Sequence, residues 1–274
     1  MVEYVIANAT VVPVRENPSE GAEQLTQLLF GEVCEVLDRL PRWTKIRSTL
    51  DGQEGWVDFK MVSLASSLIA SSPHRLEAVV ATPMVPATPM DGGADLLLTL
   101  GTCLPNYSHG TFEVLGQQYL IDPTCVSTAQ RSTGEADLQQ SDLQRSDLAT
   151  IAQSLLNAPY LWGGKNIMGM DCSGFTQVVY AAMGVNLLRN AREQMTQGEL
   201  IPCLSDAQPG DLAFFDHADR DPKATNISHV GLLLSPTEII HCSGCVHIDT
   251  IDEQGIHLSD GTLTHHLVCI KRYL

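Results

Sequence analysis

A cysteine and two histidines are the residues of this chain whose types and spacing best fit nucleophilic catalysis. Cys172, in GMDCSGF, falls at the first turn of a predicted helix, where unpaired N–H groups and the helix dipole favour a thiolate. His229 opens the apolar segment HVGLLL, and His241 closes TEIIHC. On adjacent antiparallel strands this spacing can place both imidazoles at the same end of a sheet. Each of these three residues alone is more often a structural residue than a catalytic one. Together they predict a nucleophile, a base and an orienting group.

The segment IHCSGCVHID offers a second chemistry, because its two cysteines and two histidines are typical zinc ligands. A CxxC pair usually needs a second ligand pair elsewhere, and this sequence has no second CxxC. The adjacent His265 and His266 would point to opposite faces of a strand. We therefore expect no metal and no other cofactor, and we interpret Cys242 and Cys245 as ordinary thiols.

The elements that must position these residues are a helix and a sheet. Apolar residues at i, i+3, i+4, i+7 and i+8 from Phe175 predict an amphipathic helix from DCSG to Gly184. An earlier helix is predicted to begin near Ser146 and to end before Pro159. The segments DLAFF, HVGLLL, TEIIHC and HLVCIKRYL are predicted strands of one antiparallel sheet. A helix packed on such a sheet indicates an α+β domain, which we place at residues 148–274.

The N-terminal half has a different pattern. Turn signals such as NPSEG and LDGQEG separate short runs rich in Val, Leu, Ile and Trp, which predicts a small β-barrel at residues 1–66. The pattern returns more loosely at residues 75–129, and the likeness of LLFGEVCEVL to LLTLGTCLPNY favours a diverged duplication. The polar residues 130–147 are interpreted as a linker.

Composition limits the partners. The 274 residues include 32 acidic and 16 basic side chains, and the net charge of −16 disfavours nucleic acid and anionic membranes. No basic residue precedes Arg15 and polar residues interrupt the first apolar run, so no secretory signal is visible. We expect a cytoplasmic protein, or an extracytoplasmic one if a signal has been removed. The eight dispersed cysteines are expected to be mostly buried free thiols.

Several motifs together resemble one known family. PYLWGGKNIMGMDCSGFTQ, followed by PGDLAFF, ISHVGLLL and IIHCSG, resembles the NlpC/P60 family of papain-like cysteine peptidases over roughly residues 148–274. The segment GWV (Gly55, Trp56, Val57) is similar to bacterial SH3 domains. Two such barrels before an NlpC/P60 domain resemble the YkfC-type γ-D-glutamyl-L-diamino acid endopeptidases. That resemblance implies trimming of peptidoglycan stem peptides by a papain-like α+β domain preceded by two SH3-like barrels.

The resemblance also implies roles for the candidate catalytic residues. Cys172 would attack the carbonyl of the γ-D-glutamyl bond, and His229 would be its general base. His241 would hold the base in the correct tautomer. The oxyanion would be bound by the Cys172 backbone N–H, with the Tyr160 hydroxyl nearby.

Substrate recognition is implied in the same way. Asp171 and Ser173 would bind the free amine of an N-terminal L-Ala, while Tyr160 and Trp162 would shape the pocket. The first barrel is expected to close one side of the cleft, through side chains that the resemblance does not identify. The family often has Arg, Asp, Ser after the catalytic helix, whereas this chain has Arg189 followed by Asn and Ala, which weakens the inference about the amine.

The expected function is therefore cleavage of L-Ala-γ-D-Glu-diamino acid peptides during cell-wall recycling. One alternative is a secreted hydrolase that acts on intact peptidoglycan. Two others are a wall-binding protein without activity and a zinc protein built on HCSGCVH.

Overall fold

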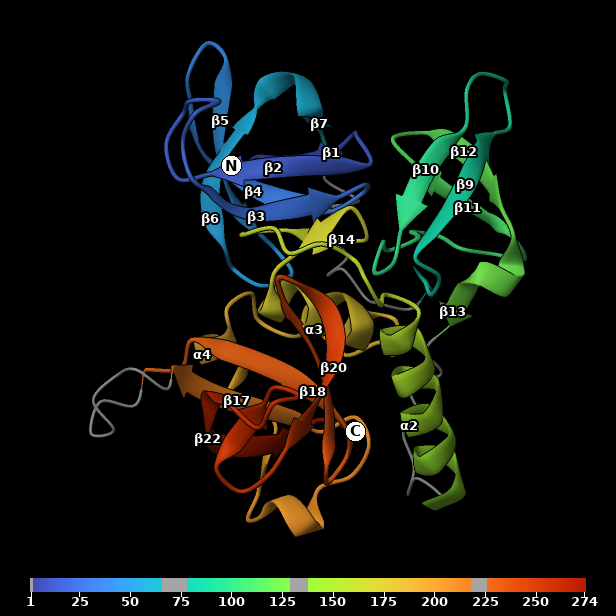
Figure 1. Ribbon diagram of the computed structural model, residues 1–274. Helices are drawn as coiled ribbons and strands as arrows, with labels where there is room; N and C mark the ends of the chain where they lie inside the picture. The colour runs from blue at the N-terminus through green and yellow to red at the C-terminus, as the bar shows by residue number, and fades with distance from the viewer. Residues whose placement is uncertain (1, 66–77, 129–137, 218–225) are drawn as a thin grey trace.

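The computed structural model describes residues 2–65, 78–128, 138–217 and 226–274. Figure 1 shows two strand-rich units, blue and green, side by side above a C-terminal unit that contains the central helix. None of the helices in these described ranges is long and apolar enough to span a lipid bilayer. The fold is α+β, as the sequence predicts, and strands predominate.

The first unit is a strongly bent antiparallel sheet with strand order β3-β2-β6-β5-β4-β1-β7. Alternating residues such as Val12, Val14 and Val57 fill its core. A Cβ atom on Gly55 would lie 2.5 Å from Val14 Cγ1 and 2.9 Å from the Arg15 carbonyl oxygen. The glycine of the GWV segment is therefore required by the close approach of β6 to β2. The elements are β1 (Tyr4–Ala7), β2 (Val11–Arg15), β3 (Gln24–Leu29), β4 (Val33–Arg39), β5 (Trp43–Ser48), β6 (Glu54–Asp58), η1 (Phe59–Met61) and β7 (Val62–Leu64).

The second unit consists of a four-stranded sheet, β10-β9-β12-β11, and a two-stranded sheet, β13-β8. Its apolar core, which contains Val80, Leu98 and Phe112, is continuous with Ile6 and Phe30 of the first unit. The first unit therefore keeps its own core and packs a few further apolar residues against the core of the second unit. That the second unit is a duplicated copy of the first stays a prediction. The elements are β8 (Ala78–Val80), β9 (Met84–Pro89), β10 (Leu96–Thr99), β11 (Thr111–Val114), β12 (Gln117–Ile121), η2 (Pro123–Cys125) and β13 (Val126–Thr128).

The C-terminal unit is built on a seven-stranded sheet of order β16-β22-β17-β18-β19-β20-β21, in which β21 also pairs with β22. The sheet therefore closes on itself, and the four predicted strands all lie in it. The elements are α2 (Leu138–Gln153), β14 (Lys165–Asn166), β15 (Gly169–Met170), α3 (Cys172–Ala181), α4 (Ala191–Gln194), β16 (Glu199–Ile201), η3 (Leu204–Asp206), β17 (Leu212–His217), β18 (His229–Ser235), β19 (Glu238–Ser243), β20 (Cys245–Ile251), β21 (Gly255–His257) and β22 (Leu263–Arg272).

Helix α3 packs on β18 and β19 through an apolar face that includes Phe175, Val178 and Val179. The helix ends at Ala181, and Gly184 follows with φ +74°, which agrees with the predicted glycine stop. All eight cysteines are free thiols in the structure.

The prediction that the helix before Pro159 begins near Ser146 is wrong, because α2 already begins at Leu138. The interpretation of residues 130–147 as a linker stays a prediction. Residues 130–137 lie outside the described ranges. Leu, Gln and Arg are good helix formers, so a polar stretch becomes helical where its backbone continues an adjoining helix. Polar composition therefore does not exclude the start of a helix.

Candidate active site

Cys172 is the first residue of α3, and its thiol lies against the start of β18. Asp171 caps the helix by accepting a hydrogen bond from the Gly174 N–H at 2.7 Å. The Cys172 sulfur accepts hydrogen bonds from the backbone N–H groups of Val230 and Ser173. Burial and the nearby Asp171 carboxylate raise the pKa of the Cys172 thiol to about 12. The thiol is therefore protonated at neutral pH and needs a base that removes its proton during attack.

His229 and His241 are in contact, as the strand spacing predicts. His229 Nε2 lies 2.8 Å from His241 Nδ1, and both rings are buried. The two residues come from neighbouring strands, because Gly231 of β18 pairs with His241 of β19. His229 precedes Val230, whose N–H contacts the Cys172 sulfur, so the thiol and the two imidazoles share one end of the sheet.

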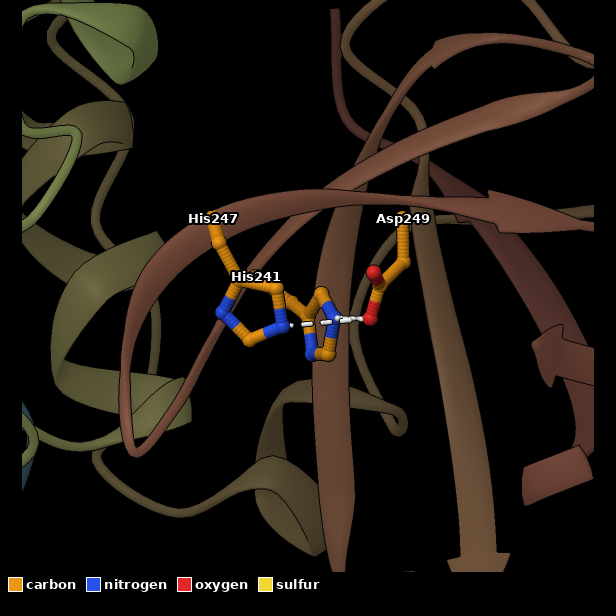
Figure 2. Close-up of side chains that lie close together, drawn as sticks. All are labelled: His241, His247 and Asp249. Atoms are coloured by element: carbon orange, nitrogen blue, oxygen red, sulfur yellow. Dashed lines mark hydrogen bonds and ion pairs between the residues drawn. The ribbon is translucent and has the colours of Figure 1, made fainter. Parts of the chain in front are cut away.

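Asp249 extends this series of contacts beyond the residues chosen from the sequence. Its Oδ2 atom lies 3.1 Å from His241 Nε2. Figure 2 marks this contact with a dashed line. The hydrogen bond with His241 lowers the pKa of Asp249, whereas burial lowers the pKa of His241. An ionised carboxylate and a neutral imidazole therefore meet at this contact at neutral pH.

The Asp249 contact determines which ring nitrogens carry protons. A carboxylate only accepts hydrogen bonds, so neutral His241 carries its proton on Nε2 and offers Nδ1 as an acceptor. His229 must then donate from Nε2 to His241, which leaves its Nδ1 as the basic nitrogen. Asp249 thereby sets the tautomer that a general base acting through Nδ1 requires.

His265 is a second residue that the sequence does not single out for this site. Its ring lies 4.4 Å from that of His229, centroid to centroid, with 30° between the planes. Phe215 also contacts the His229 ring, at 6.1 Å. These two rings limit the orientations open to His229.

The Asp171 carboxylate is surrounded by hydrogen-bond donors of the protein itself. The carboxylate accepts five hydrogen bonds, from two Arg189 nitrogens, the backbone N–H groups of Gly163 and Gly174, and the Ser173 hydroxyl. Arg189 is only 1% exposed, and its Nη1 atom also donates to the Ser173 oxygen at 2.9 Å. The acceptor positions of Asp171 are therefore filled by donors of the chain itself. In this arrangement Asp171 and Ser173 brace the start of α3, and a ligand amine would have to displace one of their present partners.

Two known domain families match the chain, one in its N-terminal half and one in its C-terminal half. Residues 157–263 match the model of the NlpC/P60 family, and residues 10–63 match the model of the bacterial SH3 domain. The C-terminal unit is an NlpC/P60 domain. The first unit is a bacterial SH3 domain.

Relatives with both halves are also found. A gamma-D-glutamyl-L-lysine dipeptidyl-peptidase of Bacillus subtilis (strain 168) is 28% identical over 229 residues, covering 79% of this chain and 71% of the relative. Dipeptidyl-peptidase 6 of Lysinibacillus sphaericus is 26% identical over 279 residues, covering 90% and 93%. The crystal structure of an NlpC/P60 family protein from Bacillus cereus ATCC 10987 has a TM-score of 0.78 at 19% identity, covering 99% of each chain. That last similarity shows a shared fold.

In the NlpC/P60 domain, Tyr160 and Trp162 lie on the loop before Cys172. Burial and the nearby Cys172 raise the pKa of the Tyr160 hydroxyl, which places this phenol close to the thiol. Trp162 is 60% exposed, and its Nε1 atom donates to Glu23 Oε1 of the SH3 domain at 2.8 Å. Gln24 donates to the Trp162 carbonyl oxygen at 3.1 Å. The SH3 domain thus contacts the loop that the sequence assigns to substrate binding.

A buried ion pair also joins the NlpC/P60 domain to the SH3 domain. Lys165 Nζ lies 2.7 Å from Glu32 Oε1, with both side chains almost fully buried. Gln27 Oε1 accepts from the Lys165 N–H and from Asn166 Nδ2. Thr26 Oγ1 accepts from Arg189 Nε at 2.7 Å, so the same strand also reaches the residue that holds Asp171. These contacts identify the side chains through which the first barrel meets the site.

Asn190 and Gln194, which follow Arg189, have structural roles. The Asn190 N–H donates to Glu193 Oε2 at the start of α4. The Gln194 side chain donates to the carbonyl oxygens of Ser173 and Leu188 and contacts the Thr176 hydroxyl. Gln194 therefore ties the Arg189 loop to the first turn of α3.

Proposed function

We propose that this protein is a cysteine peptidase that cleaves the bond between γ-D-Glu and a diamino acid in peptidoglycan stem peptides with a free N-terminal L-Ala. The observation that carries the proposal is that the Cys172 sulfur lies at the N–H of Val230, the residue after His229, and that His229 contacts His241, which in turn contacts Asp249. The gamma-D-glutamyl-L-lysine dipeptidyl-peptidase that this chain resembles over 79% of its length supports the choice of bond.

The chemistry follows from the tautomers. His229 Nδ1 takes the thiol proton of Cys172 as the sulfur attacks the γ-carbonyl carbon of D-Glu. The imidazolium formed is stabilised by His241, which is polarised by the Asp249 carboxylate. His229 then gives the proton to the leaving amine of the diamino acid. Water hydrolyses the resulting thioester, with His229 again acting as base, and the dipeptide L-Ala-D-Glu is released.

The free amine of the substrate is best recognised by a carboxylate of the SH3 domain. Glu23 is an exposed carboxylate beside the exposed Trp162 ring, and it has acceptor capacity beyond its one bond to Trp162 Nε1. An ammonium at this position would form a charge-assisted hydrogen bond that an acylated amine does not form. Selection for a free N-terminus fits soluble peptides already released from the glycan. We place this reaction in the cytoplasm, where fractionation of cells producing the untagged protein should recover it.

The test compares L-Ala-γ-D-Glu-diaminopimelate with its N-acetylated form by mass spectrometry of the products. The free peptide should be split into L-Ala-D-Glu and diaminopimelate, and the acetylated peptide should be cleaved much more slowly. Cys172→Ala should abolish cleavage, whereas Cys242→Ala, which removes a buried thiol that donates to the Met170 carbonyl oxygen, should keep most of it. Equal cleavage of the two peptides would favour a hydrolase of intact wall, and loss of activity with Cys242→Ala alone would refute the assignment of the nucleophile.

A further inference from the structure

The hairpin formed by β19 and β20 carries a group of three metal-ligating side chains. His241 Nε2, His247 Nε2 and Asp249 Oδ2 all lie within 4.8 Å of one another, and Figure 2 shows the three side chains converging. His247 pairs directly with His241 across the hairpin, and Asp249 follows two residues later on the same face. The catalytic proposal uses His241 and Asp249 but assigns nothing to His247.

The other ring nitrogen of His247 is held by the backbone of the same hairpin. His247 Nδ1 lies 2.8 Å from the Cys245 carbonyl oxygen, which can only accept, so Nδ1 carries a proton. This contact turns the Nε2 atom toward Asp249 Oδ2, at 3.1 Å. The hairpin thus directs the ring nitrogen toward the carboxylate, in the geometry of two ligands that share one ion.

The donor set fits a transition metal. Zinc bound tetrahedrally by imidazole nitrogens and a carboxylate oxygen has neighbouring ligand atoms about 3.3 Å apart, from its bond lengths of about 2.0–2.2 Å. The two separations in the hairpin that involve Asp249 Oδ2 are both 3.1 Å. A metal-binding histidine commonly donates its other ring N–H to a backbone carbonyl, as His247 does to Cys245. The side chain of His247 is 32% exposed, which gives an ion access and leaves a position for water.

We propose that His241, His247 and Asp249 bind a divalent transition-metal ion, with Zn²⁺ preferred, and that the bound ion inhibits the peptidase. The inhibitory part rests on the proposed function. A metal on His241 Nε2 leaves the ring proton on Nδ1, so His241 becomes a donor toward His229 Nε2. His229 must then carry its own proton on Nδ1, where it can no longer accept the proton of the Cys172 thiol.

Binding is tested apart from activity. The full chain with Cys172→Ser, which removes the thiol as a competing ligand, is titrated with Zn²⁺ against a chromophoric chelator. One equivalent should bind. Combining Cys172→Ser with His247→Gln, which keeps a hydrogen-bond donor for Asp249, should weaken zinc binding by a factor of at least roughly 100. Loss of an outer hydrogen-bond partner of a metal ligand costs up to about 100-fold in affinity, and loss of a ligand itself should cost no less. Adding Cys245→Ser instead should leave the affinity unchanged. Equal zinc affinity with and without His247 would overturn the site.

Inhibition is tested with the intact nucleophile. Metal-free wild type and His247→Gln should hydrolyse the free tripeptide at similar rates, and Zn²⁺ should inhibit the wild type at concentrations at least 10-fold below those that affect the variant. A chelator should restore the wild-type rate. Equal inhibition of both proteins would assign the effect to Cys172 and overturn the mechanism. If metal-free wild type were inactive, the proposed function would fail, whereas the zinc titration would still decide the site.

Discussion

Replacing Asp249 by alanine tests whether the carboxylate sets the tautomers of the two catalytic histidines. The variant removes the acceptor that lies 3.1 Å from His241 Nε2 and leaves the Cys172 thiol and both imidazoles in place. Without it, His241 can carry its proton on either nitrogen. In one of these tautomers His229 Nδ1 is protonated and cannot act as base.

The expected loss follows from the strength of this contact. A hydrogen bond to a charged partner contributes about 1.5–3 kcal/mol. Asp249 is one residue further from the nucleophile than His241 and its side chain is 15% exposed, so we take a value near the lower end, about 2 kcal/mol. Because about 1.4 kcal/mol is a factor of ten in rate, kcat should fall about 30-fold. KM should change little, because Asp249 acts through His241 and does not contact substrate.

Steady-state kinetics on the free tripeptide, with a chelator present to exclude metal effects, measure this change. Asp252→Ala is the matched control, since Asp252 accepts a hydrogen bond from His257 at 2.9 Å on the same sheet but away from Cys172. Asp249→Glu should recover part of the rate by restoring a carboxylate. A kcat within threefold of wild type, or a loss that appears only in KM or equally in the control, would refute the tautomer argument.

Two further predictions concern the contacts between the SH3 and NlpC/P60 domains. Lys165→Met leaves the Glu32 carboxylate buried without its cation and should lower the free energy of unfolding by about 3–5 kcal/mol at neutral pH. The loss of unfolding free energy, measured by urea unfolding, should shrink at acid pH, where Glu32 becomes protonated, because burial already raises the pKa of Glu32. The loss should also shrink when Lys165→Met is combined with Glu32→Gln. A loss of the same size under both conditions would contradict the ion-pair explanation. Glu23→Gln should lower kcat/KM for the free tripeptide about tenfold and leave slow cleavage of the acetylated peptide unchanged, with Glu20→Gln as control. Equal loss for both peptides would exclude amine recognition by Glu23.

The contact between His229 and His241 could be predicted from the sequence because their positions depend on local patterns. A single hairpin places His229 and His241 on adjacent strands, and apolar alternation orients them. Asp249 does not stand out in the sequence, because CSGC has the spacing of a metal knuckle as well as that of a turn. In the structure Gly244 has φ +77° and connects β19 to β20, so His241 pairs with His247 and Asp249 comes within reach. A Ser-Gly pair between alternating runs is a hairpin signal that could have identified it.

The contacts between domains could not be predicted in the same way. Thr26, Gln27 and Glu32 are polar residues of a small barrel, and their burial follows only from docking against the NlpC/P60 domain. Arg189 is fully buried, a place that arginine rarely occupies without a partner, and its partners come from two domains. Nothing in the spacing of the chain relates residue 26 to residue 189.

Arg189 connects the SH3 domain to the candidate active site. Its guanidinium holds Asp171 with two hydrogen bonds, and its Nε atom donates to Thr26 of β3. Asp171 in turn caps the helix that begins with the nucleophile, so the position of Cys172 depends on a docked SH3 strand. The same strand begins at Gln24, whose side chain donates to the Trp162 carbonyl oxygen, so one SH3 strand contacts both the Arg189 side chain and the loop before Cys172. Under the proposed function, these contacts would make the activity on short peptides depend on the docked SH3 domain.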